Sequence, residues 1–156
     1  MEERKIILGL GNTLNKDEGS GIHLLNALQE KLGELAGVEY VDGGVLGLNL
    51  LPWVEACSHL LVLDAVNANQ PPGTVVELEK DQIPMYTGVK LSDHQVTFQE
   101  VLGLAKFREK LPEYLHLVGV QPADISIGIE LSPVVQQAFP EMMKRVKTRL
   151  LLWDLL

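Results

Sequence analysis

The sequence predicts an α/β fold: a three-layer α/β/α sandwich around a mostly parallel sheet of about five strands. The main observation is that short, continuous apolar runs, typical of strands buried on both faces, alternate with amphipathic helical patterns. A second observation is that the 156 residues contain no repeat, linker or low-complexity stretch. We therefore expect one domain over residues 1–156, which is long enough to bury a core of its own.

The first half of the chain supplies three strands and two helices. Strands are predicted at Lys5–Leu10, Val38–Val41 and Leu60–Leu63, because each is an apolar run that ends at Gly or Asp. A helix is expected from about Glu18 to Leu35, where apolar residues recur along one face. A shorter helix is expected over Leu48–Cys57.

The second half supplies two strands and two helices. The turn at residues 70–73 precedes an expected edge strand at Thr74–Leu78, and Tyr114–Val120 is expected to be the last strand. Between them, a helix follows the Ser92–His94 stretch and ends near Phe107. The pair Ser132-Pro133 places a cap before a first-turn proline, which predicts the start of a final helix that Pro140 kinks.

Composition excludes several classes of function. The formal net charge of −8 argues against binding to nucleic acid and to anionic membrane surfaces, both of which depend on Lys and Arg. The single cysteine, Cys57, excludes an internal disulfide and favours a reducing compartment. No signal peptide and no apolar run long enough for a membrane span is apparent, so we expect a cytoplasmic protein without membrane insertion.

Three acidic residues follow the first three predicted strands. In a parallel α/β sheet, ligands bind beyond the carboxyl ends of the strands, so Glu18, Asp42 and Asp64 are expected at the same edge. The first loop is not a dinucleotide fingerprint, because Leu14 replaces its third glycine and phosphates would meet Asp17 and Glu18, which repel them. A structural alternative is that Asp17 caps the first helix and Glu18 complements its dipole.

One of the four histidines stands out by its position. His94 lies at an expected helix start after a long loop, whereas the other three are expected on the surface, at the opposite edge and in the core: His23, His59 and His116. Glu18, Asp64 and His94 form a ligand set that suits Zn, Ni, Mn or Fe and leaves coordination positions open. From the residues alone, two alternatives stay open: Asp64 starts a turn and bonds to loop amides, and His94 has no function.

Ordered motifs cover nearly the whole chain. They are Gly-Leu-Gly-Asn-x5-Glu at Gly9–Glu18, Asp-Gly-Gly-x2-Gly at Asp42–Gly47, the strand-end Asp64, Pro72-Gly73-Thr74, His94-Gln95 and the Leu117–Pro122 stretch. In this order and at this chain length, they resemble the hydrogenase maturation endopeptidases. The resemblance implies a phosphorylase/hydrolase-like α/β fold and a single peptidase domain.

The resemblance also implies an activity. Such proteins remove a C-terminal extension from the precursor of a nickel–iron hydrogenase large subunit once nickel is in place. Their nickel ligands correspond to Glu18, Asp64 and His94, and Asp42 matches a position that assists or orients. The family is classed as aspartic-type, which implies catalytic roles for Glu18, Asp64 or Asp42. We expect the substrate to present the nickel, and Zn or Cd could occupy the site in vitro.

The sequence is compatible with more than one mechanism and more than one class of protein. The metal could act as a Lewis acid, or it could serve as a recognition handle while a carboxylate acts as general base. A non-cleaving, nickel-dependent chaperone or adaptor of the large subunit would need the same ligands. Peptidyl-tRNA hydrolases share the Gly-Leu-Gly-Asn start, but the rest of their pattern and a basic surface are missing here.

Overall fold

The protein is built on one five-stranded sheet. The computed structural model describes residues 3–85 and 97–156. The strands run in the order β2-β1-β3-β5-β4, with the first four parallel and β4 antiparallel to β5. Their bounds are β1 Arg4–Leu10, β2 Val38–Gly44, β3 Cys57–Ala65, β4 Val75–Glu79 and β5 Tyr114–Val120. The predicted α/β class is therefore confirmed.

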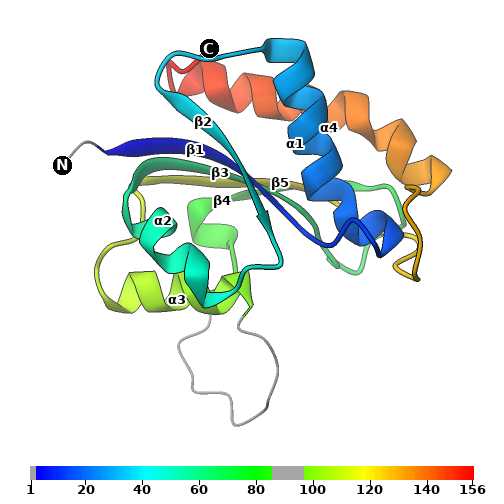
Figure 1. Cartoon of the computed structure of the whole chain (residues 1–156), viewed down its shortest axis with the longest axis horizontal. Helices are drawn as coiled ribbons and strands as arrows, with labels where there is room; N and C mark the ends of the chain where they lie inside the picture. Colours follow the sequence, from blue (N-terminus) through cyan, green and yellow to red (C-terminus); the bar gives the residue numbers. More distant parts are fainter. Residues whose placement is uncertain (1–2, 86–96) are drawn as a thin grey trace, which may run out of the picture.

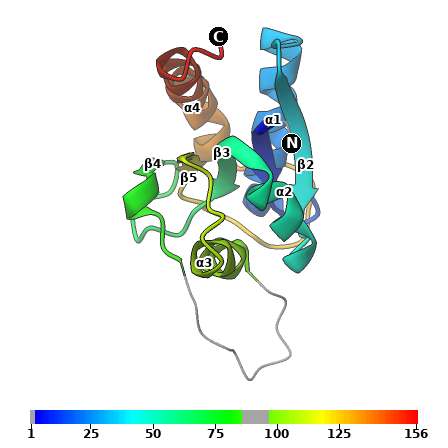
Figure 2. The same ribbon diagram turned by 90° about the vertical axis from the view of Figure 1, so that its left-hand side faces the viewer.

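Helices cover both faces of the sheet and make three layers (Figures 1 and 2). The α-helices are α1 Ser20–Leu32, α2 Leu51–Glu55, α3 Phe98–Phe107 and α4 Pro133–Leu152, and three 3-10 helices are η1 Lys16–Gly19, η2 Leu48–Leu50 and η3 Lys80–Gln82. α1 and α4 pack on one face, and α2 and α3 pack on the other. No helix among the described residues is long and apolar enough to cross a bilayer.

The alternation of side chains along the buried strands divides the core in two. One cluster joins alternate residues of β1 and β3, such as Leu8 and Val62, to Val101 and Leu102 of α3. The other joins the intervening residues to α1 and α4 and includes Met142, which is fully buried. Because both faces of the central strands are buried, their sequences are continuous apolar runs rather than alternating ones.

The strand order reverses between β1 and β3, and this reversal determines where a ligand can bind. From β1 the chain crosses by α1 to β2 on one side, and from β2 it crosses by α2 to β3 on the other side. The loops after β1 and β3 therefore diverge and leave a crevice at the carboxyl ends of these strands. Glu18 lies in the segment after β1, and Asp64 is the last residue but one of β3, so both acids identified from the sequence border the crevice.

Several predicted boundaries differ from the observed ones. The expected Glu18–Leu35 helix is the 3-10 turn η1 followed by α1, which ends at Leu32 before Gly33. The expected Leu48–Cys57 helix is η2 followed by α2, and Cys57 already belongs to β3. Strand β2 and the start of β3 extend past the apolar runs because their pairing with β1 continues, and the end of β3 extends because Asp64 and Ala65 pair with β5.

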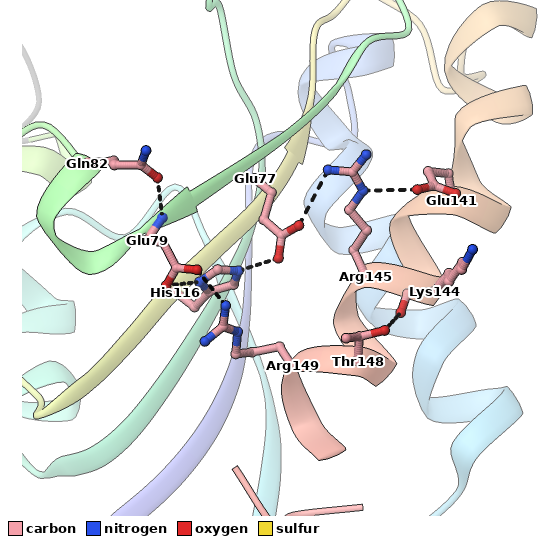
Figure 3. A network of polar contacts seen from close by, with 9 residues as sticks. All are labelled: Glu77, Glu79, Gln82, His116, Glu141, Lys144, Arg145, Thr148 and Arg149. Atoms are coloured by element: carbon pink, nitrogen blue, oxygen red, sulfur yellow. Dashed lines mark hydrogen bonds and ion pairs between the residues drawn. The ribbon is translucent and has the colours of Figure 1, made fainter. Parts of the chain in front are cut away.

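Arginine–glutamate ion pairs fix the edge strand β4 to α4, and a buried histidine of β5 contacts the same strand (Figure 3). The His116 side chain is fully buried in β5, as expected, and its Nε2 lies 2.6 Å from Oε2 of Glu77. Two arginines of α4 bind the same strand: Arg145 contacts Glu77, and Arg149 contacts Glu79 at 2.6 Å. These contacts join α4, β4 and β5 on the side of the sheet away from β2.

The first turn of α1 packs directly on the strand ends, which makes Gly21 sensitive to substitution. A Cβ at this position would lie 2.2 Å from the carbonyl oxygen of Leu63 and 2.4 Å from that of Leu10. Gly21→Ala is therefore expected to lower the free energy of unfolding by about 1–3 kcal/mol, although alanine is the better helix former. Urea denaturation measures this change. Asn26→Ala, at an exposed position of the same helix, should change it by no more than about 0.5 kcal/mol.

Candidate active site

The loop after β1 brings Glu18 back to the end of the strand that precedes it. Gly11 has a φ of +127°, and a Cβ there would lie 1.9 Å from the carbonyl oxygen of Glu18, so only glycine fits. The turn is closed by the Asn12 N–H, which donates to the Glu18 carbonyl at 3.1 Å. The Gly11 N–H donates to the Gly44 carbonyl at 2.9 Å, which joins this loop to the end of β2.

Asp64 lies near the end of β3, at the same edge. Its Oδ1 accepts a hydrogen bond from the Ala65 N–H at 2.8 Å. Neighbouring atoms enclose much of the side chain, while part of it stays in contact with solvent. Burial raises the pKa of Asp64 to about 7; the negative charge of Glu18 adds to the rise, and the Ala65 hydrogen bond opposes it. Asp64 can therefore gain or lose a proton near neutral pH.

Glu18 and Asp64 line one open cavity of about 330 Å³. The rest of the wall comes from the loop after β2, including Val45 and Leu46, and from the start of α3 around Thr97. Val45 and Leu46 are both at least half exposed, which gives the cavity an apolar rim above its acidic residues. Such a cavity is suited to an extended polypeptide that carries an apolar side chain beside a cationic group.

The structure does not bring Asp42 into this cavity. In the register of the sheet, Asp42 pairs with Gly9, which pairs with Leu63. Neighbouring residues in one row point to the same face, so Asp42 faces the α1 side whereas Asp64, one position after Leu63, faces the α3 side. The Asp42 Oδ1 accepts a hydrogen bond from the Gly44 N–H at 2.9 Å, so this residue holds the turn that begins the cavity wall.

His94 lies outside the described residues. The nearest described residue on its C-terminal side, Thr97, caps α3 through its side chain and lines the same cavity as Glu18 and Asp64. Within residues 3–85 and 97–156, no three His, Cys, Asp or Glu side chains come together as a metal site. The described part of the chain thus contributes two of the three predicted ligands.

The acidic pair fits a divalent cation chemically. Two carboxylates supply oxygen donors of the kind that borderline-hard metals accept, and the charge of Glu18 raises the pKa of Asp64. A bound cation would reverse this effect, because it would favour the ionised form of both groups. The same pair would repel a phosphate.

Asp17 has a role that sequence reasoning missed. It is not the cap of α1, as the structural alternative supposed, because it lies inside η1 and is fully buried. Its carboxylate accepts four hydrogen bonds: from the N–H groups of Ala123, Asp124 and Ser132 at 2.7–3.0 Å, and from the Ser132 hydroxyl at 2.7 Å. Burial alone would raise the pKa of Asp17, but these bonds outweigh it and hold the pKa below its usual value.

The partners of Asp17 are more than 100 positions away in the sequence, and no local pattern predicts them. The only signal was an acidic residue next to Glu18, which is equally typical of a helix start. Asp17 connects η1, and with it Glu18, to the segment between β5 and α4. It therefore fixes the position of the site rather than taking part in it.

Comparison with known proteins agrees with this architecture. A family model described as hydrogenase maturation protease matches residues 22–149. The chain belongs to the hydrogenase maturation protease family. The matched range includes Asp64 and His94 and begins after Glu18.

Curated relatives of this protease-family chain are hydrogenase formation proteins. The hydrogenase expression/formation protein HupD of Thiocapsa roseopersicina is 40% identical over 134 residues, covering 85% of this chain and 61% of the relative. HupD of Rhodobacter capsulatus is 38% identical, and 64% of its length is covered. The chain thus spans less than two thirds of these two relatives. The hydrogenase 2 maturation protease of Escherichia coli is 33% identical over 144 residues, with 92% of this chain and 88% of the relative covered.

Solved structures of the same protease family share the fold. The hydrogenase maturating endopeptidase HybD from E. coli superposes with a TM-score of 0.81 at 32% identity, covering 94% of this chain and 91% of that one. A [NiFe] hydrogenase maturation protease HybD from Thermococcus kodakarensis gives a TM-score of 0.68 at 25% identity, with 93% and 97% covered.

The shifted pKa of Asp64 predicts a measurable dependence on pH. Carbon-13 chemical shifts of the carboxyl group should report a pKa of about 7, and Glu18→Gln should lower it because one cause of the rise is removed. Asp42→Asn is the matched control and should leave the pKa of Asp64 unchanged, because Asp42 faces the other side of the sheet.

The raised pKa of Asp64 also determines how the free energy of unfolding changes with pH. An unfolded Asp ionises near its ordinary pKa of 3.8, so folded Asp64 holds its proton over the interval up to about pH 7. The Asp64 contribution to the free energy of unfolding is then fully present below that interval and is lost as the pH rises through it. Wild-type protein should therefore lose stability relative to Asp64→Asn between pH 4 and 7, and an unchanged difference would contradict the burial of this carboxyl.

Proposed function

We propose that this protein is an endopeptidase that removes the C-terminal extension from the precursor of a nickel–iron hydrogenase large subunit after nickel insertion. The observation that carries the proposal is the pairing of Glu18 and Asp64 in one cavity at the β1–β3 crevice. Membership of the hydrogenase maturation protease family and the names of the relatives, which include a hydrogenase 2 maturation protease and an endopeptidase, support it. We further propose that it acts in the cytoplasm.

Nickel enters this proposal as part of the substrate. Glu18 and Asp64, together with His94, would bind the nickel that the precursor presents and so hold its C-terminal segment in the cavity. The C-terminal segment of an empty precursor would lack this cation and would not be held in the cavity between the two acidic side chains. Cleavage would then depend on prior insertion of the metal. Val45 and Leu46 at the rim would contact an apolar side chain beside the scissile bond.

Carboxylate chemistry suits the side chains that the cavity offers. Asp64 has a pKa of about 7 before the substrate binds, and the nickel cation would favour its ionised form, so Asp64 could accept a proton at neutral pH. It would take a proton from a water molecule as the water oxygen adds to the scissile carbonyl carbon. The proton would then pass to the leaving amine as the C–N bond breaks, which regenerates the carboxylate. Asp42 would act indirectly, by holding the Gly44 turn.

Cysteine catalysis does not fit this chain. Cys57 is the single cysteine, is buried, and lies at the amino end of β3, the opposite edge from the cavity. Burial raises its pKa to about 12, so the thiol remains protonated at neutral pH and is a poor nucleophile. Its Sγ contacts the Trp53 carbonyl at 3.1 Å, which is a structural role.

Processing of the nickel-loaded precursor tests the proposal directly. Mass spectrometry before and after incubation should show loss of a C-terminal segment, and Glu18→Gln, Asp64→Asn and His94→Ala should each slow this loss by about 100-fold or more. Glu34→Gln, an exposed carboxyl after α1 at the opposite edge, should process at the wild-type rate. An unchanged precursor mass together with a stable complex would instead identify a non-cleaving adaptor.

Removal of nickel provides a second test. Precursor produced without nickel should remain at full length, whereas the same preparation loaded with nickel should be cut. Purified enzyme should contain far less than one equivalent of nickel by elemental analysis, because the metal arrives with the substrate. Rapid cleavage of nickel-free precursor would contradict the role of nickel as a signal.

A further inference from the structure

The segment between β5 and α4 presents an unusual row of apolar side chains to solvent. Ile125, Ile127 and Ile129 alternate with small or polar residues and are 55%, 89% and 71% exposed. Leu14, in the loop after β1, is 63% exposed. We call these four residues the isoleucine patch. Isolated exposed apolar residues are common, but several on adjoining segments indicate a contact surface.

Backbone hydrogen bonds place the two segments of the patch side by side. Asn15 and Gly128 form a parallel β-bridge, in which the Gly128 N–H donates to the Leu14 carbonyl and the Lys16 N–H donates to the Gly128 carbonyl, both at 2.9 Å. Leu14 and Ile127 each lie one residue before this bridge. The patch is thus one surface, although Leu14 is more than 110 positions away from the three isoleucines in the sequence.

The exposure of the patch is built into the structure. Its segment contains neither helix nor strand, yet it is held by the four hydrogen bonds to the buried Asp17 carboxylate. Lys16 adds an ion pair to Asp124 at 2.9 Å, and the Asn15 side chain donates to the Ile125 carbonyl at 3.1 Å. These hydrogen bonds and the ion pair hold the backbone of the segment against the rest of the protein, so the isoleucine side chains face solvent.

The patch adjoins the candidate active site. Leu14 and Glu18 belong to the same loop, and the isoleucine segment leaves β5, the strand next to β3 and Asp64, at the same edge of the sheet. In Figure 1 this segment lies beside the short turn that precedes α1. A large partner seated on the patch could therefore extend a terminal segment into the cavity without leaving the surface.

We propose that the isoleucine patch docks an apolar surface on the folded body of the large-subunit precursor while its C-terminal segment enters the Glu18–Asp64 cavity. This inference rests on the proposed function. Charge argues for this occupant over a second copy, because two chains of formal charge −8 repel each other. A precursor that presents a cation to the adjoining cavity is complementary in charge as well as in apolar surface.

Docking and cleavage can be separated by the use of nickel-free precursor. This probe keeps the folded body but lacks the cation, so its binding can be measured by isothermal titration calorimetry without turnover. The double variant Ile127→Ser, Ile129→Ser should weaken binding by about tenfold or more, because two buried isoleucine contacts are lost. On nickel-loaded precursor the same variant should raise KM far more than it lowers kcat.

A matched control is available on the far side of the molecule. Phe107 ends α3 at the opposite edge of the sheet and is 78% exposed, so Phe107→Ser removes a similar exposed apolar side chain outside the patch. It should bind the precursor as wild-type protein does. Circular dichroism melting curves should show that all variants are folded, because none of these side chains belongs to the core.

Each outcome bears on the proposal. Equal affinity of the double variant and wild type, or no binding of wild type to the nickel-free precursor, would overturn it. A wild-type dimer in sedimentation velocity that the double variant abolishes would also overturn it, in favour of a second copy as occupant. Failure of wild type to cut nickel-loaded precursor refutes the peptidase function alone; weaker binding of the variant would then still support docking.

Discussion

The parallel pairing of β1 with β3 is the constraint on which the site depends. It aligns Gly9 with Leu63, so the loops that follow the two strands start from the same level of the sheet. The chain leaves these strands toward opposite sides, and the space between the loops cannot be filled by either crossover. Gly11 and Gly21 then allow the backbone to approach closely enough for Glu18 and Asp64 to share one cavity.

The resulting pair of carboxylates is electrostatically unfavourable in the isolated protein. Burial and the charge of Glu18 both resist ionisation of Asp64, and hydrogen bonding to Ala65 recovers only part of this cost. Sites that hold like charges in a partly buried space are typical of function, because an incoming ligand of opposite charge relieves the repulsion. In the proposed function that ligand is the nickel of the precursor, which would couple metal insertion to processing through electrostatics alone.

Asp17 shows the opposite use of a buried carboxylate. Its charge is satisfied by four donors, so it is a fixed anchor rather than a reactive group. Through it, a segment without regular secondary structure becomes part of the rigid frame, and the loop that carries Glu18 is held to the start of α4. Asp17 thus fixes the loop, whereas its neighbour Glu18 lines the cavity.

The sequence by itself determined the α/β class, the position of the strands and two of the acids at one edge, because burial on both faces leaves continuous apolar runs and parallel strands end together. It overestimated the length of α1, which ends before Gly33, and underestimated β2 and β3, because pairing with β1 and β5 rather than local composition sets the ends of these strands. Only the tertiary structure decided that Asp42 and Asp64 face opposite sides of the sheet, that Asp17 binds residues over 100 positions away, and that Leu14 joins the isoleucine row. These facts depend on register and on contacts between distant segments, which no local pattern encodes.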